Sequence, residues 1–415
     1  MKLVSKKLLL SAIAGTLIAP AVFAQDAAAA DQTPAPEETT VAPTEQTVAP
    51  AEQNDMPSLH VDTTAEKPTI VLEIPTAEDK LKVQFTGLIQ GQYIYASASG
   101  GHSSDQNGFS IRRAILGFTA DFGDDWSAKL TYEFDSKSEG GSVNNGYIDV
   151  ATISRKFGDI GTLSVGHRKV HFMLEEYTSS SKLPCIERSF NSNFLTGNSY
   201  AKGIDSSHIG VFWDGNLSED IDYGLSLTNA VAKDYDKRSN NLAITGNIGS
   251  KFKLDDDSQL YLGLNATVNF GDKDGAEKGA ATNAGTVFGL EPYVRYDNGG
   301  LSLLADFFYV NGDSDSNIQA VYGLNLTATY RMENNFEPAI RFTYLNTESG
   351  LVNANTQNRV PDSGDHNCAA TYYFGVNYYF NKYVRASAGY EFGHYFGNGG
   401  SDSSGAFRTM LQISF

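Results

Sequence analysis

Several kinds of residue are scarce in this chain of 415 residues. It has two Cys, two Trp and five Met, and after residue 24 no apolar run approaches the roughly 18 residues that a membrane-spanning helix needs. A bundle of membrane helices is therefore excluded. The length suits two or three ordinary domains or one large sheet, and the abundance of Gly (40), Tyr (22) and Phe (24) favours the sheet.

Basic residues are also in deficit, with 31 Lys and Arg against 49 Asp and Glu, which gives a formal net charge of −18. Residues 1–24 carry +3 and residues 25–58 carry −7, which leaves −14 for the remainder. Proteins that bind nucleic acid hold the phosphate backbone with an excess of Lys and Arg. The charge balance therefore argues against nucleic acid as a partner.

Signatures of catalysis and of metal binding are missing too. The seven His residues are scattered along the chain, and no G-x-S-x-G elbow marks a serine nucleophile. The adjacent acids Glu175 and Glu176 resemble a catalytic pair, but adjacent acids in a loop are more often solvated or salt-bridged, here with Arg188 or Lys182. We expect no enzyme activity, no metal site and no cofactor.

The first 80 residues have the composition of export and spacer segments. Three Lys residues precede the apolar run "LLLSAIAGTLIAPAVFA", which predicts a signal peptide over residues 1–24, cleaved after Ala24. Residues 25–58 are rich in Ala, Pro, Thr and Glu and repeat "TVAPTEQ" as "TVAPAEQ", which is typical of a disordered, extended spacer. Residues 59–80 are transitional, so residues 25–80 form the predicted periplasmic spacer and transition.

Period-two alternation begins at Leu81 and continues to the last residue. In "WSAKLTYEF", for example, Trp126, Leu130 and Phe134 share an apolar face opposite Lys129 and Glu133. Sixteen such strands can be counted, and they begin near residues 81, 109, 126, 143, 160, 206, 220, 240, 258, 285, 300, 318, 335, 369, 384 and 406.

The connections between these strands alternate in length. Every second one is a tight polar turn, such as "GDD" at 123–125, and the others are mostly longer, including 172–205, 271–284 and 346–368. Short periplasmic turns and longer outer loops are typical of barrels in the bacterial outer membrane. Backbone groups in hydrocarbon must pair internally, so the sheet has to close. The sequence predicts an all-β fold, a 16-stranded antiparallel transmembrane β-barrel over residues 81–415 whose polar faces line a lumen.

The chain ends on an amphipathic strand, "FRTMLQISF". Phe407, Leu411, Ile413 and Phe415 share one face of this strand, and Phe is the last residue. Such an ending resembles the signal by which outer-membrane barrels are delivered to their assembly machinery. We therefore expect the barrel assembly machinery to recognise this terminus through Phe415.

Two stretches resemble the phosphate-selective porin O and P family. "FSIRRAILGFTADFGDDWSAKLTYEFD" (109–135) is similar to the family's I-R-R-A-R-x-G-F strand, short turn and following W-x-x-K/x-E-x-D strand. "VGHRKVHFMLEEYTSS" with the later "IERS" (165–189) is similar to the segment that enters the family's third outer loop. The matching residues are Arg112, Arg113, Gly117, Phe118, Trp126, Glu133, Asp135, Gly166, Lys169, Phe172, Glu175, Thr178, Ser179, Ser180, Glu187, Arg188 and Ser189.

The resemblance implies a sixteen-stranded, trimeric porin whose third loop folds into the lumen and narrows it. It makes residues 172–205 the constriction loop, with Lys169, Glu175, Glu176, Lys182 and Arg188 as its charged candidates. The chain departs from the family pattern at Ile115, where a second basic residue is usual, at His171, where Pro is usual, and at the pair His167 and Arg168.

Charges of both signs are expected along the lumen. By alternation, the inward basic residues are Arg113, Lys129, Arg168, Lys251, Lys253, Arg295, Arg331, Arg341, Arg385 and Arg408, and the inward acids are Glu133, Glu291, Asp306, Glu337 and Glu391. Selection of anions requires rings or ladders of basic residues in a confined lumen. Such a mixture predicts a weak selector.

The two cysteines, Cys185 and Cys368, both lie in predicted outer segments of an exported chain, where oxidation can occur. A disulfide between them would fix the third loop to the base of the seventh. Two unpaired thiols are equally consistent with the spacing.

We therefore expect an outer-membrane porin for passive diffusion of small hydrophilic solutes and ions, with a weak preference for anions or phosphate at most. The alternative is a structural or surface-interaction barrel with a plugged lumen. A barrel enzyme acting on lipid has no supporting triad. The expected partners are outer-membrane lipid and lipopolysaccharide, further copies of the chain in a homotrimer, and small solutes or anions.

Overall fold

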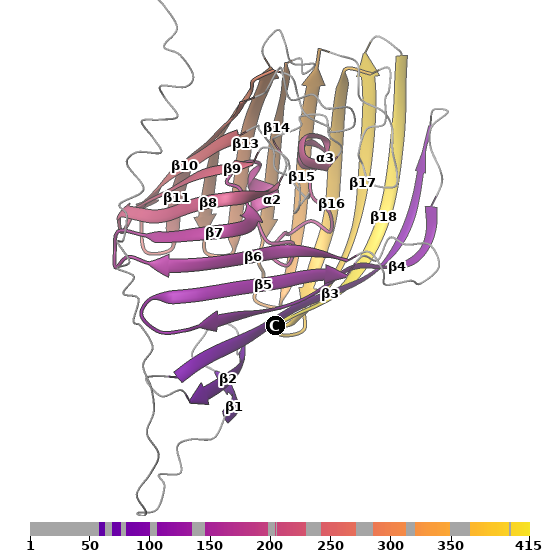
Figure 1. Ribbon diagram of the computed structural model, residues 1–415. Helices are drawn as coiled ribbons and strands as arrows, with labels where there is room; N and C mark the ends of the chain where they lie inside the picture. Colours follow the sequence, from indigo (N-terminus) through magenta and orange to yellow (C-terminus); the bar gives the residue numbers. More distant parts are fainter. Residues whose placement is uncertain are drawn as a thin grey trace, which may run out of the picture. The chain divides into compact units, whose positions relative to one another are not determined.

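The computed structural model describes residues 58–62, 69–75, 80–99, 106–134, 146–197, 204, 206–229, 242–270, 285–312, 320–348, 366–397 and 400–415. This part of the chain forms long antiparallel strands and two short helices (Figure 1). No helix in it is long and apolar enough to cross a membrane. The elements are β1 (Ser58–Asp62), β2 (Thr69–Pro75), β3 (Lys80–Ala98), β4 (Gln106–Asp121), β5 (Trp126–Phe134), β6 (Tyr147–Lys156), β7 (Thr162–Lys169), α2 (Leu174–Tyr177), α3 (Phe190–Gly197), β8 (Ser207–Ser218), β9 (Ile221–Asn229), β10 (Leu242–Lys253), β11 (Ser258–Phe270), β12 (Val287–Asn298), β13 (Leu301–Gly312), β14 (Val321–Tyr330), β15 (Phe336–Thr347), β16 (Cys368–Tyr379), β17 (Val384–Gly397) and β18 (Gly400–Ser414).

Strands β3 to β18 form a closed barrel. Each strand pairs with the next one along the chain, and β18 closes on β3 with Ser404 opposite Ala98 and Ser414 opposite Leu88. The predicted sixteen-stranded barrel is confirmed. The predicted strand starts differ from the observed ones by at most six residues, at β18, whose first residues are polar and do not alternate.

The last residue takes part in this closure. The N–H of Phe415 donates to the carbonyl of Gly87 at 3.1 Å, and the N–H of Gly87 donates to the carbonyl of Phe415 at 2.9 Å. The Phe415 ring lies directly over Gly87, where a Cβ would come within 2.4 Å of it. The absence of a side chain at Gly87 therefore lets the terminal aromatic ring pack flat on the seam.

Alternation divides the wall into two faces. On β15, Ile340 is 52 % exposed, whereas its neighbours Ala339 and Arg341 are 1 % and 3 % exposed. The same rule leaves many apolar side chains exposed on the outer face, among them Leu116, Leu130, Ile248, Leu262, Leu326, Phe374 and Leu411. A continuous exposed apolar face is unfavourable in water and suits the hydrocarbon of a bilayer.

Tight turns join the strands at one end of the barrel. In the β4–β5 turn, Gly123, Asp124 and Asp125 have φ values of 77°, 48° and 65°, and the N–H of Trp126 donates to the Gly123 carbonyl at 2.9 Å. Asp tolerates this left-handed backbone better than most residues because its short side chain can hydrogen-bond locally. At the other end the connections are longer, except that β17 and β18 are joined by a short hairpin in which Gly397 pairs with Gly400.

An N-terminal hairpin extends the sheet beyond the barrel wall. β2 pairs with the first part of β3, from Pro75 opposite Lys80 to Ile70 opposite Phe85, where β18 does not reach. β1 pairs in turn with β2. The sequence predicted only a transition over residues 59–80, because Pro68 and Pro75 suggested interruption. Instead, Pro68 precedes the apolar run "TIVLEIP" in the sequence and Pro75 is the last residue of β2, so neither interrupts the strand. The predicted signal peptide and the spacer up to residue 57 lie outside the described residues.

Candidate functional site

The connection between β7 and β8 folds into the barrel. We call residues 170–206 the inner loop; the structure describes 170–197, 204 and 206. Figure 1 shows its helices α2 and α3 within the outline of the wall. The inner loop is hydrogen-bonded to the inward faces of many wall strands, among them those of Glu291 (β12), Asn325 (β14), Arg341 (β15), Asn377 (β16), Arg385 (β17) and Gln412 (β18).

The first turn of the inner loop contains a strained residue. Met173 has φ 59° and ψ 92°, values that cost a non-glycine residue about 1–3 kcal/mol unless the surroundings fix them. Its side chain is only 1 % exposed, and the next residue, Leu174, donates its N–H to the Glu291 carboxylate at 2.7 Å. Burial and this hydrogen bond therefore hold the chain where it turns inward and begins α2.

An apolar cluster fixes the second half of the inner loop. The side chains of Phe190 and Phe194 on α3 are fully buried, their ring centroids are 6.2 Å apart, and Phe190 meets Tyr395 of β17 edge-on at 5.6 Å. The cluster joins the inner loop to the wall and comprises Val170, Phe172, Met173, Phe190, Phe194, Leu195, Ile204, Phe212, Val287, Phe308, Val310, Val321, Leu345, Ala369 and Tyr395. Burial of these apolar side chains stabilises the position of α3 against the wall.

An ionic cluster fixes the first half. Glu175 accepts from Arg341 of β15 at 2.9 Å, and its other oxygen accepts the N–H of Ser189 at 2.6 Å. Arg188 donates to the carbonyl of Glu175 at 3.0 Å and lies 3.2 Å from the Glu176 carboxylate. Burial lowers the pKa of Arg188, and the nearby Glu176 opposes that shift. The two acids that sequence alone left as candidates are therefore structural partners of arginine.

A β-bulge places a further arginine in the lumen. The register between β3 and β4 shifts at Gln90 and Gly91, so that Arg113 pairs with Gln90 while Ile111 pairs with Gly91, and Arg112 is the extra residue. Arg112 donates to both carboxylate oxygens of Glu187 on the inner loop, at 2.7 and 2.6 Å. Alternation alone did not assign Arg112 to the lumen, because a bulge breaks the period of two.

The other basic residues predicted for the lumen fall into two groups. Arg113, Arg168 and Arg408 pair with wall carboxylates, and Arg341 and Arg385 are covered by the inner loop. Lys129, Lys251, Lys253, Arg295 and Arg331 lie toward the tight-turn end, where Lys129, Lys251 and Lys253 are exposed and the side chain of Arg295 is 56 % exposed. Arg331 lies 3.8 Å from Glu337 and 3.4 Å from the Tyr379 ring centroid.

The remaining loop candidates have local partners. The ammonium group of Lys169 donates to the Glu176 carbonyl at 2.7 Å. Lys182 lies in the turn after α2, where its backbone N–H donates to the Ser179 carbonyl at 2.9 Å. Among the inward acids, Glu291 accepts from Asn265 at 2.8 Å and Asp306 accepts from Asn325 at 2.6 Å. In the described ranges, no three His, Cys, Asp or Glu side chains come together as metal ligands do.

No disulfide joins Cys185 and Cys368 in the structure, which thus corresponds to the alternative of two thiols. Cys185 is 3 % exposed and packs with Ala339 and Tyr373 inside the barrel. Cys368 is the first residue of β16 and lies five residues before Tyr373. The side chain of Asn346 donates to the Cys368 sulfur at 3.0 Å. Five strand residues span about 17 Å, whereas bridged Cα atoms lie within about 7 Å of each other.

A family model described as phosphate-selective porin O and P matches residues 83–298, more than half of the chain. The chain belongs to the phosphate-selective porin O and P family. This porin is a protein of the bacterial outer membrane, and both its family and its fold are those of a channel for small solutes. No curated protein matches it.

Solved porin structures share this fold at low sequence identity. OmpF of Salmonella typhi in complex with daunomycin is 17 % identical with a TM-score of 0.57, covering 82 % of this chain and 100 % of that one. The anion-selective porin of Comamonas acidovorans is 13 % identical with a TM-score of 0.56, covering 81 % and 100 %. OmpT of Vibrio cholerae in its trimer form is 15 % identical with a TM-score of 0.50, covering 81 % and 99 %. At this identity, the similarity establishes the barrel fold alone.

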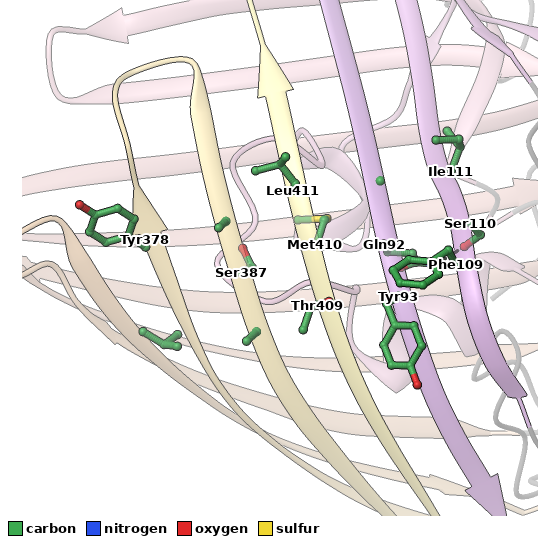
Figure 2. A pocket seen from close by; sticks show the side chains of 14 residues that line it. Gln92, Tyr93, Phe109, Ser110, Ile111, Tyr378, Ser387, Thr409, Met410 and Leu411 are labelled. Atoms are coloured by element: carbon green, nitrogen blue, oxygen red, sulfur yellow. Dashed lines mark hydrogen bonds between the residues drawn. The ribbon is translucent and has the colours of Figure 1, made fainter.

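A groove of about 920 Å³ on this porin belongs to its outer face and not to the solute path (Figure 2). Small residues form its floor at Gly91, Ala386 and Ala388. Outward side chains such as Phe109, 88 % exposed, and Leu411, 53 % exposed, border it. The groove therefore faces the surroundings of the barrel, and the candidate solute path is the lumen beside the inner loop.

Proposed function

We propose that this porin is a general diffusion channel for small hydrophilic solutes, with a weak preference for anions at most and no strong selectivity for phosphate. One observation carries the proposal: four of the arginines around the inner loop are matched by carboxylates, in the pairs Arg112–Glu187, Arg113–Glu133, Arg188–Glu176 and Arg341–Glu175. A paired charge presents a much smaller field to a passing ion than a free one.

The weak anion preference rests on the basic residues nearer the tight-turn end. Arg295 and Lys129 are exposed on the inward face there, although Asp297 lies 2.9 Å from the Arg295 guanidinium. The name of the Comamonas porin supports selection of anions by this fold in principle. Narrow lumens lined with unpaired basic residues select anions far more strongly than such a mixture does.

Planar bilayer recordings test this proposal directly. We expect ohmic single-channel currents in KCl and a chloride-to-potassium permeability ratio within about threefold of unity. Millimolar phosphate should reduce chloride current only slightly. Strong block of that current by micromolar phosphate would contradict general diffusion. Absence of any conductance, with no uptake of sugars by liposomes, would favour the plugged structural barrel.

We also propose that three copies assemble, that lipid and lipopolysaccharide surround the outer face, and that the assembly machinery recognises Phe415. The trimer form of the Vibrio OmpT supports the first part. The exposed apolar outer face and the outward ring of Phe415, 37 % exposed, support the others. Chemical cross-linking in intact outer membranes should trap a three-copy species that survives heating, whereas heating should dissociate the three-copy species that was not cross-linked. A monomer at all cross-linker concentrations would exclude the trimer.

We propose no catalytic role.

A further inference from the structure

Arg341 makes more contacts to the inner loop than any simple pore-lining role requires. One terminal nitrogen donates to Glu175 at 2.9 Å and to the carbonyl of Glu187 at 2.9 Å. The other donates to the carbonyl of Arg188 at 3.2 Å and to Glu391 of β17 at 3.3 Å. Three of these four acceptors belong to the inner loop, and the side chain is 1 % exposed.

The three acceptors come from two separate segments of the loop. Glu175 lies in α2, whereas the Glu187 and Arg188 carbonyls come just before α3. The two segments are also bound to each other, since Glu175 accepts from the N–H of Ser189 at 2.6 Å. Arg341 therefore holds, from the wall, the point at which the inner loop folds back on itself.

The guanidinium of Arg341 is not available to a solute. It is covered on the lumen side by the loop segments that it binds, and both of its terminal nitrogens are already engaged with oxygen acceptors. The Tyr373 ring lies on another side, with its centroid 5.7 Å from the guanidinium carbon. A passing anion could replace these acceptors only after the loop had moved away.

We propose that Arg341 is a positioning residue: it fixes the inner loop to β15 and thereby sets the cross-section of the lumen, and it does not act as an anion ligand. The proposal rests on the channel function given above. The positioning role requires the planar guanidinium of arginine, whose two terminal nitrogens can donate in different directions. Lysine keeps the charge but has one nitrogen, which cannot reach acceptors that lie in several directions.

The substitution Arg341→Lys separates positioning from charge. A charge-only role predicts wild-type behaviour, whereas a positioning role predicts a released loop. Cys185 is a natural reporter of release, because it is 3 % exposed and packs against Tyr373 in the folded loop. Replacing Cys368 with Ser leaves Cys185 as the single thiol of the full chain.

In the C368S background, we expect R341K to increase the rate of maleimide labelling of Cys185 by about tenfold. In bilayers it should raise single-channel conductance about twofold and admit larger uncharged polyethylene glycols, with little change in the chloride-to-potassium ratio. The matched control is R155K, an Arg-to-Lys change on the outer face of β6, where Arg155 stacks 5.3 Å from the Trp126 ring centroid. It should leave labelling and conductance unchanged.

Wild-type labelling and wild-type polymer cut-off in R341K would overturn the proposal. Labelling that rises in a protein that conducts no ions would support positioning while refuting the channel function, so the two failures are distinguishable. Heat-modifiable migration on gels identifies folded barrels in each sample. Should R341K fail to fold, E175A removes the side-chain acceptor among the three loop acceptors of Arg341. Unchanged Cys185 labelling in that variant would equally overturn the proposal.

Discussion

Charge pairing is the main property of single residues in this lumen. Glu133 shows it most simply: Arg113 donates to both of its carboxylate oxygens at 2.8 and 2.7 Å, and the Tyr147 hydroxyl donates to it at 2.6 Å. The carboxylate is 8 % exposed. The positive charge of Arg113 is therefore neutralised by the adjacent Glu133 carboxylate, and an ion in the lumen meets a nearly neutral site.

Removing one member of this pair should uncover the other. We expect Glu133→Gln to raise the chloride-to-potassium permeability ratio about twofold, because Arg113 loses its counter-charge, and Arg113→Gln to lower it by a similar factor. Reversal potentials in a KCl gradient measure the ratio.

The control for this prediction is Asp255→Asn in the β10–β11 turn. A hydrogen bond from the Ser258 side chain lowers the pKa of Asp255, so this carboxylate is charged at neutral pH and the substitution removes the same charge outside the lumen. It should leave the ratio unchanged. A shift of equal size in D255N and E133Q would show that overall charge, and not the lumen pair, controls permeation.

The sequence predicted which residues face the lumen, but it did not predict the contacts that these residues make there. Alternation placed Arg341 and Glu391 correctly on one face, because period two depends only on the local backbone. It missed Arg112, since a bulge breaks the period and depends on pairing with a distant part of β3. The positioning role of Arg341 depends on loop residues more than 150 positions earlier, which no local pattern contains.

At the scale of elements, the inner loop is held by two different kinds of anchor. The ionic anchor around Arg341 holds α2, and the apolar cluster holds α3. The first anchor is directional and fixes orientation, whereas the second removes surface from water without fixing a unique geometry. A loop held in both ways has little freedom to swing across the lumen.

Truncation of Phe194 should weaken the apolar anchor alone. Phe194→Ala removes a fully buried ring, which typically costs about 3–5 kcal/mol, and we expect α3 to detach locally while the wall stays folded. Limited proteolysis should then cut within 190–197, and open-channel noise should rise. Phe109→Ala, at an 88 % exposed outer position, should change neither property. A protease-resistant α3 in the F194A variant would mean that the ionic anchor suffices.

The strands were predictable from sequence and the inner loop was not, for one physical reason. A strand between lipid and lumen must alternate, so its pattern is visible in the sequence. A segment folded inside the lumen has no lipid face and needs no period. Only the family resemblance indicated residues 172–205 as a constriction. The β1–β2 hairpin was missed because its strands are short and flanked by proline.

At the scale of the whole molecule, the barrel closes without its N-terminal extension. The seam uses residues 87–98 of β3, whereas β2 pairs only with residues 80–85. We therefore expect a mature chain lacking residues 25–75 to assemble in the outer membrane with unchanged conductance, as judged by heat-modifiable migration and bilayer recording. Loss of the folded form would show instead that the hairpin supports β3 during closure.

The position of Phe415 on this seam has a consequence for the timing of biogenesis. Phe415 is hydrogen-bonded to Gly87, and the two strands that meet at this seam, β3 and β18, are separated by more than 300 residues of chain. Neither strand can lose its open edge until synthesis and export of the entire chain are complete. Every newly exported copy must therefore pass through a period in which the edges of β3 and β18 are unpaired and open to pairing with other chains.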